Sequence, residues 1–136
     1  LLHYASSREH LNGMCRSISR NLKPAGRFIG YQSNYDIARK PHYYDKYCFN
    51  VRISEQAGDG QPFVFSVTLG DYTSPDITAY YWSKESLESA LHDAALTEIR
   101  WVVPTPSPDG IAKQGADFWA DVMRSPFELM VICRKS

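Results

Sequence analysis

Residues 22–32 read LKPAGRFIGYQ, and the residues before them have the spacing of an amphipathic helix. The apolar stripe of that helix consists of Leu11, Met14, Cys15, Ile18 and Leu22. Pro24 cannot continue a helix and Gly26 favours a turn, so residues 27–32 are predicted to form a strand. Ser6 and Glu9 have capping-box spacing, which predicts that the helix begins at Ser6.

Residues 1–4 are short and apolar, and they are predicted to be the end of a strand. A strand, a helix and a second strand in residues 1–32 would form a βαβ unit with a right-handed crossover.

The middle of the chain has a different pattern. Residues 33–44 are polar and aromatic without a period, which indicates a loop. Residues 47–53 and 63–69 alternate apolar and polar side chains, and residues 77–82 offer a third strand. Residues 33–82 are therefore predicted to contain an antiparallel meander inserted into an α/β chain.

Residues 83–136 return to the α/β pattern. Ser83 is predicted to cap a second helix, whose buried stripe is expected to be Leu87, Ala90, Leu91 and Ala94. Residues 97–103 are rich in strand-forming side chains. Ser107-Pro108 predicts the start of a third helix, and residues 127–133 are predicted to be the last strand. The expected inner face of the third helix is Ile111, Gly115, Phe118 and Val122. The chain is thus predicted to be one domain with segments 1–32, 33–82 and 83–136.

Composition excludes several classes of protein. The 136 residues contain 15 Lys and Arg and 15 Asp and Glu, and zero net charge argues against nucleic acid as the main partner. No apolar run approaches the roughly 18 residues that span a bilayer, and the N-terminus lacks signal-peptide features, so we expect no membrane partner. Three widely spaced cysteines have no metal-binding spacing, and we expect reduced thiols in a cytoplasmic protein without a metal site.

The stretches LLHYAS at 1–6 and LKPAGRF at 22–28, on either side of a helix, resemble part of the class I S-adenosylmethionine-dependent methyltransferases. In that family the fourth strand ends in an apolar-His or aromatic turn. A helix and a Leu-Lys-Pro-Gly-Gly turn then lead to the fifth strand. The last two strands form a hairpin-like pair, and the final strand runs antiparallel to the rest. The resemblance implies an α/β fold, the C-terminal half of a Rossmann-like methyltransferase sheet with an inserted antiparallel β-meander.

The sequence departs from the family pattern at two alanines. Ala25 stands where the family usually has Gly, and Ala95 stands in Ala-Ala-Leu where Ala-Gly-Phe is common. If Ala25 needs a left-handed backbone, it would cost roughly 1 kcal/mol, unless Gly26 takes that conformation instead.

The Gly-x-Gly-x-Gly loop with which the family binds its cofactor is not found in these residues. Gly58-Asp59-Gly60 is no substitute, because it lies between alternating strands and opens no helix. We therefore expect that the chain starts at the end of the fourth strand. We also expect the isolated chain to be inactive without the upstream cofactor-binding half.

The resemblance implies S-adenosylmethionine as the cofactor and His3, Tyr4 and Ala5 as residues that bind it. These residues follow a predicted strand, and ligands of open α/β sheets bind at such strand ends. The alternative is that Leu1, Leu2 and Tyr4 belong to the core and that His3 is a satisfied polar residue.

The expected acceptor is a small organic molecule covered by the insertion. Aromatic walls with a few polar groups suit a planar substrate, although the same residues could be core or loop. The candidate substrate-binding residues are Tyr31, Gln32, Tyr35, Tyr43 and Tyr81. Methyl transfer mainly requires placement of the acceptor, and a hydroxyl acceptor also benefits from a general base. His42 and Asp36 are the candidates for that base, although each could simply be solvated.

Two other functions remain open. The chain could be a self-contained α+β domain that binds a small ligand or a partner without catalysis. It could also be a non-catalytic remnant of the methyltransferase fold that serves as an interaction module. If it is cut from a larger sheet, we expect self-association through an exposed apolar edge near residues 1–4.

Overall fold

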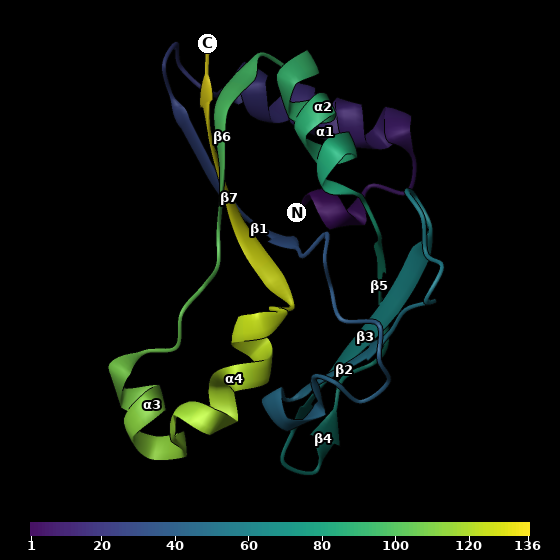
Figure 1. The fold of residues 1–136 in the computed structure, drawn as a ribbon. Helices are drawn as coiled ribbons and strands as arrows, with labels where there is room; N and C mark the ends of the chain where they lie inside the picture. Colours follow the sequence, from purple (N-terminus) through teal and green to yellow (C-terminus); the bar gives the residue numbers. More distant parts are fainter.

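The computed structural model describes residues 1–136 as a mixed α/β chain with two sheets (Figure 1). The helices are η1 (Leu2–Tyr4), α1 (Arg8–Asn21), η2 (Asp45–Tyr47), α2 (Lys84–Asp93), α3 (Pro108–Gln114) and α4 (Ala116–Arg124), of which η1 and η2 are 3-10 helices. The strands are β1 (Arg27–Ser33), β2 (Phe49–Arg52), β3 (Pro62–Leu69), β4 (Tyr72–Thr73), β5 (Ile77–Tyr80), β6 (Leu96–Val102) and β7 (Glu128–Lys135). None of the helices combines the length and the apolar character that crossing a membrane requires.

The first sheet has the strand order β1-β7-β6. Strand β7 is antiparallel to both neighbours, so β1 and β6 run parallel to each other. The register of β7 on β1 extends from Arg27 opposite Arg134 to Ser33 opposite Glu128. The antiparallel final strand and its pairing with β6 confirm what the family resemblance implied.

One face of this sheet is covered by helices α1 and α2, which lie together on that side (Figure 1). Every second residue of β7 points into this layer, because side chains alternate along a strand. Val131 and Cys133 share a core with Leu11 of α1 and Leu91 of α2. The apolar stripes predicted for both helices therefore form the first core.

The opposite face of the same sheet is much less covered. Ile29 and Tyr31 of β1 are 56% and 55% exposed, and Val102 of β6 is also exposed. Met130 and Ile132 of β7 lie opposite Tyr31 and Ile29 and are only half-buried. In addition, the described strands pair with β1 along one edge only. The sheet thus presents an apolar face and a free edge along the first part of β1, whereas at its end Tyr31 O and Ser33 N are hydrogen-bonded to Leu1 N and His3 Nδ1.

The second sheet is the predicted antiparallel meander. Strand β3 pairs with β2 on one side and with β5 on the other. Strand β4 forms a short hairpin with the end of β3. The second core brings Phe63 and Phe65 of β3 together with Tyr44 and with Phe127, which directly precedes β7. Phe127 therefore links the meander to the first sheet.

The prediction for the start of the chain was wrong in two respects. Residues 2–4 form the single turn η1 rather than the end of a strand, because Ala5 N donates to Leu2 O at 3.0 Å. A βαβ unit is therefore not formed within residues 1–32. Helix α1 is capped by Ser7 rather than Ser6, since Ser7 Oγ accepts a hydrogen bond of 3.1 Å from His10 N.

The helix predicted to start at Ser107 is correctly capped there but does not continue to residue 124. It divides at Gly115, whose φ of 81° lies outside the helical region, so α3 and α4 are separate helices. Ala25 and Ala95 have φ values of 60° and 59°. Hence Ala25, and not Gly26, adopts the left-handed conformation.

Candidate functional site

The site begins with His3, which joins η1 to the end of β1. Its Nδ1 accepts a hydrogen bond of 3.2 Å from Ser33 N, which places the ring proton on Nε2. The side chain is only 5% exposed. Burial lowers the pKa of His3 to about 4, and the nearby α-amino group of Leu1 adds to this shift. The imidazole is therefore neutral near neutral pH and acts as a fixed acceptor.

The other two candidate cofactor residues differ in their exposure. The Tyr4 ring is 44% exposed and lies against the His3 ring, with the centroids 4.4 Å apart. Ala5 is fully buried, and its carbonyl accepts a hydrogen bond of 3.0 Å from Trp82 Nε1. Of the three residues, Tyr4 offers a side-chain surface to a ligand, whereas Ala5 holds the turn in the core.

Gln32 lies beside His3 and is 1% exposed. Its side chain is a hydrogen-bond partner of the His3 ring, whose proton is on Nε2. Because the Gln32 side chain is enclosed in the core, it offers no accessible atom to a cofactor or an acceptor. Among these residues, Tyr4 has the exposed ring that fits the apolar and aromatic parts of S-adenosylmethionine.

Two of the candidate substrate residues lie together. Tyr81 OH donates to Tyr35 O at 2.9 Å, which ties the end of the meander to the loop after β1. The Tyr35 ring meets the Trp101 ring edge-on with the centroids 5.2 Å apart. The Arg39 guanidinium lies 4.9 Å from the centre of the Tyr81 ring. The result is an aromatic wall next to the end of β1.

The loop after β1 is held by Tyr44 and Asn34, whose structural contacts the sequence pattern did not predict. Tyr44 is fully buried, and its hydroxyl accepts from Ala38 N and donates to Ser125 O, both at 2.9 Å. Asn34 Nδ2 donates to Pro126 O at 2.9 Å. These contacts fasten the loop to the junction between α4 and β7. A loop without a period gives no signal from which such contacts could be inferred.

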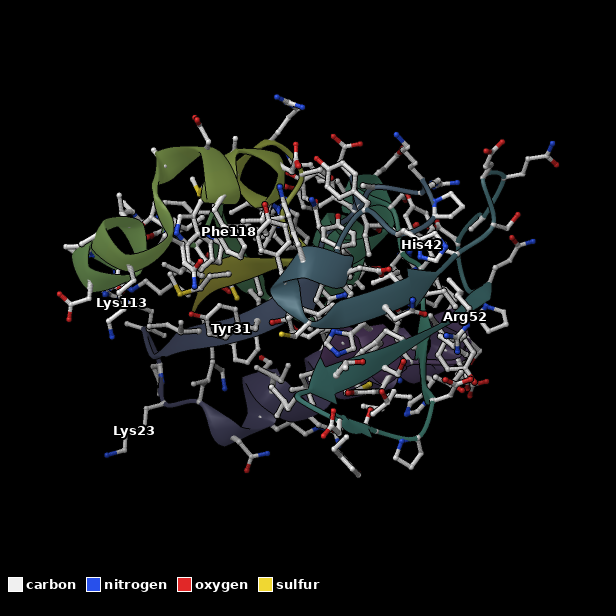
Figure 2. The ribbon with its side chains drawn as sticks, turned by 90° about the horizontal axis from the view of Figure 1, so that it is seen from below. Lys23, Tyr31, His42, Arg52, Lys113 and Phe118 are labelled. Carbon is white, nitrogen blue, oxygen red and sulfur yellow. The ribbon has the colours of Figure 1, made fainter.

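His42 and Tyr43 belong to the far part of the loop, whereas Asp36 follows Tyr35 near its start. His42 is exposed, and its Nδ1 lies 2.7 Å from Asp45 Oδ2. Tyr43 OH donates to Asp121 O at 2.8 Å, and His42 and Tyr43 line one cavity of about 590 Å³. Figure 2 shows His42 well apart from Tyr31. Asp36 is exposed and does not line that cavity, so the structure does not bring the two base candidates together.

A smaller cavity of about 200 Å³ lies at the end of β1. Glu128 lines it directly opposite Ser33 in the sheet. Burial raises the pKa of Glu128, and the α-amino group of Leu1 opposes that shift. The other walls are Tyr31, Phe49, Pro104, Val122, Pro126 and Phe127. Sequence reasoning missed Glu128, because an acidic residue at the start of a strand is common.

Solved structures similar to this chain are S-adenosylmethionine-dependent methyltransferases. One from Listeria monocytogenes matches 100% of the chain with a TM-score of 0.59 and 17% identity, and the match covers 58% of that protein. One from Mesorhizobium loti matches 99% of the chain with a TM-score of 0.58 and 16% identity, over 58% of its length. The CcbJ methyltransferase from Streptomyces caelestis also has a TM-score of 0.58, with 13% identity over 99% of the chain and 57% of its own length.

No protein-family model matches the sequence, and no curated protein is similar to it. The chain spans somewhat more than half the length of the methyltransferases that it matches. Identities of this size establish likeness of fold. The chain has the mixed α/β fold of a part of S-adenosylmethionine-dependent methyltransferases.

Proposed function

We propose that this chain is the C-terminal half of a Rossmann-like, class I S-adenosylmethionine-dependent methyltransferase that methylates a small organic acceptor. The observation that carries this proposal is the hydrogen bond from Ser33 N to His3 Nδ1. This hydrogen bond joins two segments. The first is the turn around His3, which the family resemblance assigns to the cofactor, and the second is the end of β1, which precedes the acceptor loop. The likeness of fold over the whole chain supports the same assignment.

The cofactor, when bound, supplies a methyl group on a positively charged sulfur that is already activated for transfer. The chain then has to hold the cofactor and the acceptor in place. Tyr4 offers an exposed ring to the cofactor, and Gln32 holds the His3 ring from inside the core. His3, as a neutral acceptor for Ser33 N–H, fixes the distance between the two segments.

The acceptor side would be formed by the loop after β1 and by the meander. Tyr31, Tyr35 and Tyr81 lie on these segments, and the Tyr81–Tyr35 hydrogen bond closes one wall. Tyr43 stays a candidate on the far part of the loop. His42 and Asp36 stay candidates for a general base for a hydroxyl acceptor. Because His42 lies well apart from Tyr31, its use as a base would require the acceptor to extend along the loop (Figure 2).

We also propose that the rest of the enzyme covers the apolar face and free edge at β1. Without that cover, we expect the isolated chain to self-associate. Sedimentation equilibrium of the wild type and two variants tests this. Ile29→Lys places a charge on the apolar face, and Leu69→Lys is the control, at an exposed residue of β3. We expect the oligomer to dissociate in Ile29→Lys and to persist in Leu69→Lys. A wild-type chain that stays monomeric at high concentration would contradict it.

Free thiols at Cys15, Cys48 and Cys133 support a cytoplasmic location, which we include in the proposal.

Titration of the isotope-labelled chain with S-adenosylmethionine, followed by amide NMR, tests the proposed function. We expect weak binding, because the glycine-rich loop lies outside these residues. The shifts should concentrate at Leu2–Ala5 and Ser33. Tyr4→Ala should reduce them, whereas Tyr72→Ala, which removes another exposed tyrosine, should not.

Two results would contradict the proposal. Shifts confined to other segments, or none at millimolar cofactor, would favour the non-catalytic binding domain. Micromolar affinity would show that these residues form a complete cofactor site.

A further inference from the structure

The cavity at the end of β1 combines apolar walls with one charged group. Glu128 is the carboxylate, and no Lys, Arg or His side chain lines the cavity. A ligand group entering it therefore meets a negative charge without a neighbouring positive side chain. This arrangement disfavours phosphate or carboxylate groups and favours a cation.

Glu128 is available to a ligand. The ion pairs of the structure do not include it, and its side chain makes no hydrogen bond. It is half-buried, so part of its hydration has been lost without a replacement partner. A bound ammonium would supply both the missing hydrogen-bond donor and the opposite charge.

The walls suit the rest of such a ligand. Phe127 lies nearly parallel to Phe49, with the ring centroids 4.8 Å apart and an interplanar angle of 25°. Tyr31 lines the same cavity and exposes more than half of its surface. Aromatic rings attract cations through their faces and also bury apolar groups.

The position connects this cavity with the proposed methyl transfer. Glu128 faces Ser33 across the sheet, and Ser33 N is bonded to His3. We propose that the cavity binds the ammonium group of a small organic amine and that this amine is the methyl acceptor. The second part of this statement rests on the proposed function. A volume of about 200 Å³ lies below the roughly 300–1,000 Å³ of typical ligand sites, so the amine has a short apolar body.

Binding of benzylamine and of its neutral analogue benzyl alcohol to the chain, measured by NMR without S-adenosylmethionine, tests the proposal. We expect benzylamine to bind more tightly and to shift the amides of Tyr31, Phe127 and Glu128. Glu128→Gln should lower the affinity for benzylamine about tenfold, as expected for the loss of one partly screened charge-assisted hydrogen bond. The affinity for benzyl alcohol should stay the same. Glu98→Gln, which neutralises an exposed carboxylate on β6 of the same sheet, should behave like the wild type.

Equal affinities for the amine and the alcohol would overturn the proposal. So would an unchanged affinity of benzylamine for Glu128→Gln. Because cofactor binding is measured separately at Leu2–Ala5, loss of amine binding alone would leave the proposed methyltransferase function standing. Loss of cofactor binding alone would leave the amine site standing.

Discussion

Replacing His3 by asparagine is predicted to make the stability of the chain less sensitive to acid. His3 has a pKa of about 4 in the folded chain, compared with 6.5 for a free side chain, because it is buried. The unfolded chain therefore binds a proton more readily than the folded chain. The contribution of His3 to the free energy of unfolding is therefore complete above pH 6.5, the pKa of the unfolded chain, and is lost as the pH falls toward 4, the pKa of the folded chain. The difference between the two pKa values corresponds to about 3 kcal/mol of this free energy.

Asparagine is a suitable replacement because its side-chain oxygen can accept the hydrogen bond from Ser33 N in place of Nδ1, and it does not titrate. Urea unfolding of both proteins from about pH 7 to about pH 4 should show that the wild type loses about 3 kcal/mol more than His3→Asn. Carboxylates titrate in both proteins, so their contribution cancels in this difference. His92→Asn, at an exposed histidine of α2, should follow the wild type. Parallel curves for the wild type and His3→Asn would refute the argument.

Two further predictions concern the backbone. Ala25→Gly and Ala95→Gly should each raise the free energy of unfolding, measured in urea, by about 0.5–1 kcal/mol. Glycine removes the strain of the left-handed backbone, and this gain exceeds the entropy that it adds to the unfolded chain. A destabilised Ala25→Gly would show that the strain is absent. Ser7→Ala should cost about 1 kcal/mol through loss of the helix cap, and Ser6→Ala should have little effect. Equal losses from the two serine variants would contradict the cap at Ser7.

Local periodicity was sufficient to predict most of the fold. Alternation around Phe63 and Phe65 predicted β3, and the apolar spacing of Leu11 and Leu91 predicted the helix faces that form the first core. Ser83 was correctly predicted as a cap, because its side chain accepts a hydrogen bond from Ser86 N. These features depend on residues close together in the sequence.

Features that depend on distant contacts were not predictable in this way. Residues 2–4 are too few to distinguish a strand from a helical turn by pattern. Gly115 lay within an apparent helical period, and its left-handed φ became evident only in the structure. Glu128 approaches Ser33 through the register of β7 on β1, and that register joins residues far apart in the sequence.

The turn around His3 and the cavity at Glu128 are proposed to hold a methyl donor and its acceptor side by side. Interligand NOE measurements on the chain with S-adenosylmethionine and benzylamine present together test it directly, since the method suits weak ligands. We expect an NOE between the cofactor methyl group and the protons of the amine, lost in Glu128→Gln. If both ligands bind and this NOE is absent, the turn and the cavity do not form one methyl-transfer site.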